Sequence, residues 1–303
     1  MERGAIPVAD LAGGLDLQAT LESGQSYLWR RADGEMYAGG PADGWYETVV
    51  PPIDGVLDDR AVVRVRRTDG RLEWESTVDA VPVLTHLLRL DDDLDAILAA
   101  TPDDPLLARA YDRHRGLRLV RDPPFPTLVS FICSAQMRVR RIHRMQVALA
   151  REFGDAVRVD GRTYHAFPTP GRLAARSEAD LREVKLGYRA PYVRETAAMV
   201  ADGEAHPADA ADRPYEAARE HLTRFVGVGE KVADCVLLFS LGFLEAVPLD
   251  TWIRTAIEDH YPDCDRGSYA ATSRAIRERF GGEYAGYAQT YVFHELRTRG
   301  ADD

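Results

Sequence analysis

The sequence predicts an α+β protein, in which an N-terminal antiparallel β-sheet domain is followed by an all-α region. Before residue 100, short runs of β-branched and aromatic residues alternate with turn signals, which is typical of antiparallel strands. After residue 105, apolar residues recur at helical spacing. Pro102 and Pro105 separate the two patterns. We therefore expect one domain over residues 1–104 and a second region over residues 105–303.

The strand signal is found in four segments. Each has apolar or aromatic residues flanked by turn residues, and the last follows the turn Thr68-Asp-Gly70. Partial alternation of buried and polar positions predicts a sheet with one covered face. The expected strands are residues 24–31, 45–50, 61–66 and 71–76.

The helical signal begins near Val83 and dominates after residue 105. Ser177 and Asp180 form a capping-box pattern at the start of one short helix, which we expect to end before Gly187. The spacing predicts further helices over residues 125–133, 138–149, 192–201, 215–225, 231–241, 252–259, 268–280 and about 284–298.

The composition is that of a soluble globular protein, with no apolar run long enough to span a membrane and no visible signal peptide, so we expect a cytoplasmic location. Cys133, Cys235 and Cys264 are far apart and odd in number, which favours reduced thiols over a metal or iron–sulfur site. No metal ligand set is predicted.

The net charge of −11 argues against a nucleic-acid partner, because phosphates require a basic surface. The distribution of the charge weakens that objection. The acidic residues are dispersed and lysine is nearly absent, as in proteins from a salt-loaded cytoplasm, where salt screens long-range repulsion. We therefore expect a halophilic protein.

The two lysines, Lys185 and Lys231, stand against 36 arginines. Arginine can replace lysine as a positive charge but not as an amine nucleophile, since the guanidinium stays protonated. A retained lysine is therefore a candidate for amine chemistry. The alternative is chance survival on a solvated surface, and we assign Lys185 to that class.

Lys231 follows the turn Phe225-Val-Gly-Val-Gly-Glu, so a helix-hairpin-helix is expected at about residues 215–241. Gly227 and Gly229 permit a tight turn and a close approach to another molecule. The free N–H groups of the next helix can bind a phosphate. The alternative is an ordinary helical hairpin that only packs within a bundle.

Asp250 stands where the next helix should begin, after Pro248. One interpretation is a helix N-cap, which stabilises by about 1 kcal/mol. The other is a carboxylate beside Lys231 that orients a nucleophile or stabilises positive charge. The two roles are compatible.

These motifs resemble those of the 8-oxoguanine DNA glycosylase/AP lyase family, within the helix-hairpin-helix Gly/Pro…Asp DNA glycosylases. The resemblance begins with Gly227–Cys235 and Ala246–Asp250. It covers roughly residues 10–298, because further segments match in order: Gly24–Trp29, Phe131–Ser134, Tyr164–Pro168, Leu186–Ala190 and Ala285–Gln289.

The resemblance implies that a damaged purine is flipped out of double-stranded DNA. Lys231 would attack C1′ of the sugar, expel the base and leave a Schiff base that permits strand cleavage, with Asp250 supporting both steps. It also implies a base pocket, in which the Gly24 carbonyl reads N7–H of 8-oxoguanine, Gln289 reads the base edge, Phe293 and Cys235 enclose the base, and Pro248 contributes to the wall.

The remaining matched positions would contact DNA outside the pocket. The resemblance assigns Tyr188 and Arg189 to a wedge, Gln136, Arg141 and Arg189 to the opposite cytosine, and Gly227, Gly229, Val232 and Trp252 to DNA phosphate. Two positions depart from the eukaryotic pattern: Gln136 replaces an asparagine and Trp252 replaces a histidine. The family requires no cofactor and permits a monovalent cation at the hairpin. We expect a monomer.

Two other functions remain open at this stage. A monofunctional glycosylase for alkylated purines, of the 3-methyladenine type, would activate water and need no lysine. A helix-hairpin-helix module could instead bind DNA without chemistry. The iron–sulfur endonuclease branch is disfavoured, since its C-terminal cysteine cluster is absent from the sequence.

Overall fold

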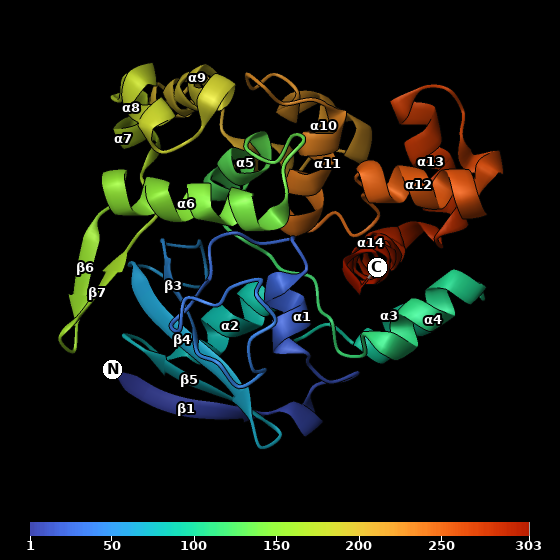
Figure 1. The fold of residues 1–303 in the computed structure, drawn as a ribbon, viewed down its shortest axis with the longest axis horizontal. Helices are drawn as coiled ribbons and strands as arrows, with labels where there is room; N and C mark the ends of the chain where they lie inside the picture. The colour runs from blue at the N-terminus through green and yellow to red at the C-terminus, as the bar shows by residue number, and fades with distance from the viewer. Residues whose placement is uncertain (303) are drawn as a thin grey trace.

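The computed structural model of the protein describes residues 1–302. A five-stranded sheet occupies one side of the molecule, and helices cover the rest (Figure 1). The sheet has the order β1-β5-β4-β3-β2, and every neighbouring pair is antiparallel. Its strands are β1 (Glu2–Pro7), β2 (Arg30–Arg31), β3 (Tyr46–Val50), β4 (Ala61–Thr68) and β5 (Arg71–Ser76).

The inner face of the sheet is apolar and the outer face is charged. Along β5, Leu72 and Trp74 are buried, and in β3 the buried residues alternate with partly exposed ones. On the outer face, Arg66 pairs with Glu73 across β4 and β5 at 2.7 Å. This alternation fixes the register, because a shift by one residue would bury the charges.

Two features of the sheet differ from the expectation. Strand β1 was not predicted; it pairs with β5, where Gly4 lies against the Trp74 ring so closely that a side chain would clash. Residues 24–29 form no strand. Instead, the Gln25 side chain donates to the Arg118 carbonyl at 2.8 Å and accepts from the Val120 N–H at 2.9 Å. This segment is therefore fixed to a distant part of the chain rather than to a neighbouring strand.

The helices of the first part of the chain are α1 (Leu17–Glu22), α2 (Ala80–Leu88), α3 (Leu94–Ala99) and α4 (Pro105–Arg113). One apolar core, drawn from residues 15–90, fills the space between the sheet and helices α1 and α2. Leu94 and Ile97 of α3 already pack in the next core. The chain thus passes from the first apolar core to the next before residue 104, and the domain boundary expected there stays a prediction.

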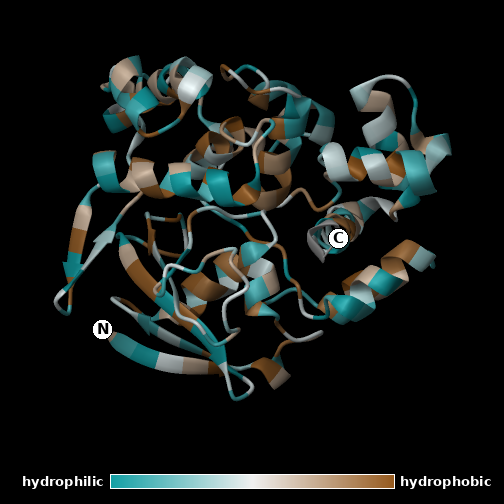
Figure 2. Ribbon diagram, in the orientation of Figure 1, coloured by the Kyte–Doolittle hydropathy of each residue, from teal (hydrophilic) through white to brown (hydrophobic). Residues whose placement is uncertain are grey.

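The second part is largely helical, as predicted, with α5 (Pro124–Ile132), α6 (Val139–Phe153), α7 (Pro170–Ala174), α8 (Glu178–Glu183), α9 (Ala190–Ala201), α10 (Tyr215–Leu222), α11 (Glu230–Phe239), α12 (Thr251–His260), α13 (Tyr269–Arg279) and α14 (Ala285–Asp302). The apolar helices α5 and α11 lie at its centre (Figure 2). The capping box at Ser177 is present.

The expectation of an all-α second region is wrong in one place. Strands β6 (Ala156–Val159) and β7 (Arg162–His165) form a two-stranded hairpin that projects from the end of α6 (Figure 1). Asp160 and Gly161 lie between them, both at positive φ, as a tight hairpin turn requires. The three cysteines are free and buried. Within residues 1–302, no helix has the length and hydropathy of a membrane span.

Candidate active site

Lys231 lies in the first turn of α11, directly after the hairpin that joins α10 to α11. Its Nζ donates a hydrogen bond to the Ser134 hydroxyl at 3.1 Å and lies 5.5 Å from the centre of the Phe131 ring. Phe131 lies in the last turn of α5, and Ser134 follows just beyond the end of that helix. The amine therefore contacts a neutral hydroxyl and an aromatic face.

Asp250 is the N-cap of α12, as predicted: its Oδ1 accepts the Ile253 N–H at 2.8 Å. Burial raises the pKa of the Asp250 carboxyl, while the charge of Lys231 and the N–H groups of Ile253 and Trp252 oppose that rise. The structure thus brings Lys231 and Asp250 within electrostatic reach.

Cys235 lies one helical turn after Lys231, on the same face of α11. The side chain is buried, and burial raises the pKa of its thiol to about 12. The thiol is therefore neutral at ordinary pH and cannot compete with the amine as a nucleophile. It can serve as an apolar wall.

Gly24 and Phe293 lie next to each other, although they are far apart in sequence. Gly24 has a φ of +99°, and a methyl group added there would lie 3.6 Å from the Phe293 ring. Gln289 lies one turn before Phe293 on α14; it is buried, and its carbonyl accepts from the Thr290 hydroxyl at 3.2 Å. Pro248 is buried, and its carbonyl accepts the Asp250 N–H at 3.0 Å.

The residues expected to contact the opposite strand gather around the loop between α5 and α6. Gln136 is exposed in that loop, with a φ of +53°, and Arg141 is exposed in the first turn of α6. Arg189 donates to the Ala135 carbonyl, and its guanidinium lies 4.3 Å from the centre of the Tyr188 ring. Tyr188 is 56% exposed, whereas Arg189 is 5% exposed. The aromatic ring is therefore the projecting part of this pair.

The hairpin has the conformation that its glycines allow. Gly227 has a φ of +81° and packs against the Tyr192 ring, while Gly229 is the N-cap of α11 with open space beside it. The Val232 side chain is buried, so only its backbone faces the helix end. Trp252 is partly exposed in the first turn of α12. Gly229 and Asp250 are thus the N-caps of two consecutive helices, α11 and α12, and only Asp250 caps with its side chain.

Comparison with known proteins assigns the fold. Residues 129–281 match the family model of the HhH-GPD superfamily base excision DNA repair protein, and residues 10–128 match the N-terminal domain of 8-oxoguanine DNA glycosylase.

The chain belongs to the HhH-GPD superfamily of base excision DNA repair proteins.

This HhH-GPD protein is 33% identical to a probable N-glycosylase/DNA lyase of Methanothermobacter thermautotrophicus, over 98% of this chain and 97% of the relative. Its fold is similar to the 8-oxoguanine glycosylase/lyase of Clostridium acetobutylicum solved with double-stranded DNA containing cytosine opposite 8-oxoG, with a TM-score of 0.81, 28% identity and coverage of 94% and 93%. The structure of MBOgg1 with a low-affinity DNA ligand has a TM-score of 0.84, 28% identity and coverage of 98% and 96%.

Two residues of the HhH-GPD site were not expected from the sequence. Ser134 is the hydrogen-bond partner of Lys231. Tyr27 packs edge-on against Phe131 at 5.8 Å, and its pKa is raised by burial and by the nearby Cys235 and Asp250. Both belong to segments that carry the family resemblance, Phe131–Ser134 and Gly24–Trp29, but hydroxyl groups give no periodic signal that would identify them as site residues.

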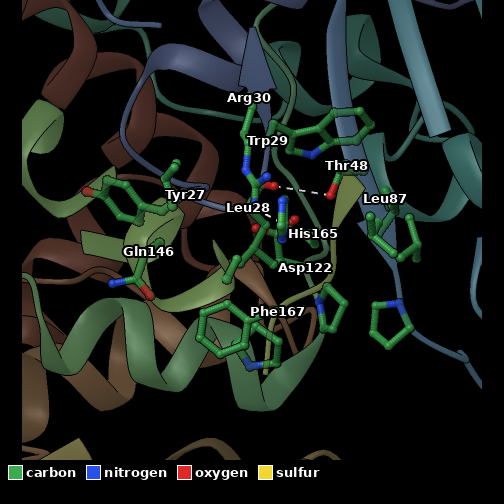
Figure 3. A pocket seen from close by; sticks show the side chains of 17 residues that line it. Tyr27, Leu28, Trp29, Arg30, Thr48, Leu87, Asp122, Gln146, His165 and Phe167 are labelled. Carbon is green, nitrogen blue, oxygen red and sulfur yellow. Dashed lines mark hydrogen bonds between the residues drawn. The ribbon is translucent and has the colours of Figure 1, made fainter. Parts of the chain in front are cut away.

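A separate cavity lies between the sheet and α6, lined by Tyr27, Trp29, Arg30, Asp122 and His165 among others (Figure 3). Its volume is about 30 Å³, room for one or two waters and not for a nucleobase. Neither Lys231 nor Asp250 lines it. Among the described residues, no group of three or more His, Cys, Asp or Glu could hold a metal ion.

Proposed function

We propose that the protein is a bifunctional DNA glycosylase/AP lyase that excises 8-oxoguanine from double-stranded DNA. The observation that carries this proposal is the position of Lys231 and Asp250 at the starts of two consecutive helices, where the charge of Lys231 opposes the rise in the pKa of the Asp250 carboxyl. The two relatives with solved structures, one bound to DNA with 8-oxoG, support the choice of substrate.

The chemistry requires an amine, and Lys231 supplies it. The Nζ lone pair forms a bond to C1′ while the bond from C1′ to the base breaks, and the base leaves with a proton that the bonded nitrogen gives up. The C1′–O4′ bond then breaks as O4′ takes a proton from water, which leaves a protonated imine on Lys231. Water or another base removes a proton from C2′, and the electron pair expels the 3′ phosphate, which cleaves the strand. Asp250 stabilises the positive charge that develops at the sugar.

The base pocket that we propose combines both halves of the chain. Gly24 would present its carbonyl to N7–H of the damaged base, and the contact of Gly24 with Phe293 supports a common pocket. Cys235 and Phe293 would enclose the base from two sides, Gln289 would bind its edge, and Pro248 would close the wall beside Asp250.

The DNA contacts outside the pocket are also a proposal. Tyr188, the most exposed of these side chains, would wedge into the duplex, while Arg189, Arg141 and Gln136 would face the orphaned cytosine. The N–H groups around Gly227, Gly229, Val232 and Trp252 would bind phosphate.

We further propose a monomer that works in the cytoplasm, at the nucleoid when bound to DNA, and that is adapted to high salt.

A monovalent cation at the hairpin carbonyls would bind without taking part in the reaction. The Val226 carbonyl already accepts from Thr196 at 3.0 Å, so such a cation would share that oxygen. The proposed cation site is tested by exchange of potassium for tetramethylammonium at constant ionic strength, since only the smaller ion, potassium, fits between carbonyls.

Borohydride trapping with a duplex containing 8-oxoguanine opposite cytosine tests the function. The wild-type protein should form a covalent adduct, and Lys231→Gln should form none while still binding the duplex. The matched control is Lys185→Gln, which removes the other lysine, an exposed one, and should trap as wild type. An undiminished adduct in Lys231→Gln would refute the assignment. If the wild type released the base but formed no adduct, the protein would instead be a monofunctional glycosylase.

A further inference from the structure

Asp234 is a buried carboxylate with no part in the chemistry described above. It lies three residues after Lys231 on α11, and its side chain is fully buried. Both oxygens accept hydrogen bonds: the Tyr215 hydroxyl donates to Oδ1 at 2.7 Å, and the Tyr269 hydroxyl donates to Oδ2 at 2.8 Å. Arg219 lies 3.8 Å from Oδ2. Burial raises the pKa of the Asp234 carboxyl to about 7, while the hydrogen bonds from Tyr215 and Tyr269 and the charge of Arg219 oppose that rise.

Tyr269 connects this carboxylate to the catalytic loop. Its hydroxyl accepts the Leu249 N–H at 3.1 Å, and Leu249 directly precedes Asp250. A phenol has a single proton. Because that proton is given to Asp234, the oxygen lone pairs face Leu249. The direction of both bonds is thereby fixed, and donation to a carboxylate strengthens the chain of bonds.

The chain of bonds joins the two elements that must be aligned for the reaction. One end is the helix of Lys231, through Asp234, and the other is the peptide before Asp250. Pro248 has no N–H of its own to hold this peptide. Tyr269 is the first residue of α13, and its ring packs against the core that α12, α13 and α14 share with Val247 and Leu249.

We propose that Tyr269, held by Asp234, is a positioning residue that fixes Asp250 relative to Lys231. This inference rests on the proposed function for its effect on rate, while the contact itself concerns the free protein. Misplacement of a catalytic group by about 1 Å can cost as much as 10²-fold in rate. Loss of the phenol oxygen frees the Leu249 peptide and should act on the chemical step rather than on DNA binding.

The test is Tyr269→Phe, which keeps the ring and removes the hydroxyl. We expect the single-turnover rate of base release to fall about tenfold or more, with duplex affinity unchanged. The matched control is Tyr261→Phe. The Tyr261 hydroxyl also donates to a buried carboxylate, that of Asp104 at 2.8 Å, but lies at the far end of α12 from Asp250. It should lower stability without lowering the rate.

A double-mutant cycle separates positioning from a general loss of stability. If Tyr269 acts through Asp250, then Tyr269→Phe should slow the wild type but have little further effect in Asp250→Asn. The proposal would be overturned if the double variant slowed by the product of the two single fold-decreases. It would also be overturned if Tyr269→Phe released the base as fast as the wild type.

Hydrogen exchange provides a readout that does not depend on activity. In the free protein, exchange of the peptide that contains Leu249 and Asp250 should be faster in Tyr269→Phe than in wild type and unchanged in Tyr261→Phe. Unaltered exchange in Tyr269→Phe would refute the contact. An inactive wild-type protein with the expected exchange difference would refute the proposed function and leave the positioning contact standing.

Discussion

At the scale of single residues, the site is built from groups whose surroundings decide their protonation. Asp122 is the clearest case outside the chemistry. Its carboxyl is buried at the junction of the sheet and the helices and accepts from the Ser26 hydroxyl at 2.5 Å. Burial raises its pKa to about 7, and the Ser26 hydrogen bond only partly opposes that rise.

This raised pKa predicts how stability depends on pH. An unfolded Asp loses its proton near pH 4, whereas folded Asp122 keeps it to about pH 7. Its contribution to stability is therefore complete below pH 4 and is lost as the pH rises through 7. The slope is at most about 1.4 kcal/mol per pH unit. Urea unfolding at pH 5, 6 and 7 should show Asp122→Asn gaining stability relative to wild type by on the order of 1 kcal/mol per unit.

Ser26→Ala serves as the second variant in this experiment. It keeps the carboxyl but removes the donor that lowers its pKa, so the decline in stability should extend to higher pH. If the free energies of unfolding of wild type and Asp122→Asn changed in parallel with pH, the raised pKa of Asp122 would be contradicted.

At the scale of elements, the hairpin between α10 and α11 depends on one backbone conformation. Gly227 has a φ of +81°, and a Cβ there would lie 2.8 Å from the Tyr192 ring. An alanine in this conformation costs roughly 1–2 kcal/mol before any clash. We expect Gly227→Ala to weaken binding to undamaged duplex about tenfold and to reduce the salt dependence of binding, because a phosphate contact is lost.

Fluorescence anisotropy at several salt concentrations measures both effects. The control is Gly203→Ala, at a φ of +72° with nothing within 4 Å, in the turn after α9. It introduces the same backbone strain away from the hairpin. Equal losses of affinity in the two variants would show that strain, and not the hairpin, is responsible.

Sequence patterns predicted most helices and strands and placed Lys231 and Asp250 at helix starts, while their catalytic roles stay a prediction. The elements and contacts that the sequence did not predict share a physical cause. Lys231 and Asp250 were predicted because each sits at a helix start with a local signature. Residues 24–29 were read as a strand because their aromatic residues suit one, but Gln25 binds backbone groups 93 and 95 residues away. Ser134 and Tyr269 were missed for the same reason, since their roles lie in contacts across the fold.

At the scale of the whole molecule, the charge distribution is the dominant feature. The chain has 49 acidic residues and a net charge of −11, so like charges repel across a largely acidic surface. Many arginines are engaged at the sheet surface, for example Arg66 with Glu73 at 2.7 Å. Salt weakens such exposed pairs, but it also screens the net repulsion.

We expect the screening of net repulsion by salt to outweigh the weakening of exposed ion pairs. The thermal unfolding midpoint should rise by a few degrees between about 0.1 and 2 M KCl, a change equivalent to about 1 kcal/mol or more for a chain of this size. Differential scanning calorimetry in KCl and in NaCl at matched concentrations measures it. A midpoint that is flat or falls with KCl would rule out adaptation to high salt.

The attachment of Gln25 to the backbone of Arg118 and Val120 also governs how the protein forms during translation. Gly24, which lies beside Phe293, emerges from the ribosome long before either anchor. A nascent chain that ends before Arg118 lacks both anchors, so this loop must wait unfixed while synthesis proceeds. Gly24 is thus made early in synthesis, and its loop can be fixed only after Arg118 and Val120 have emerged.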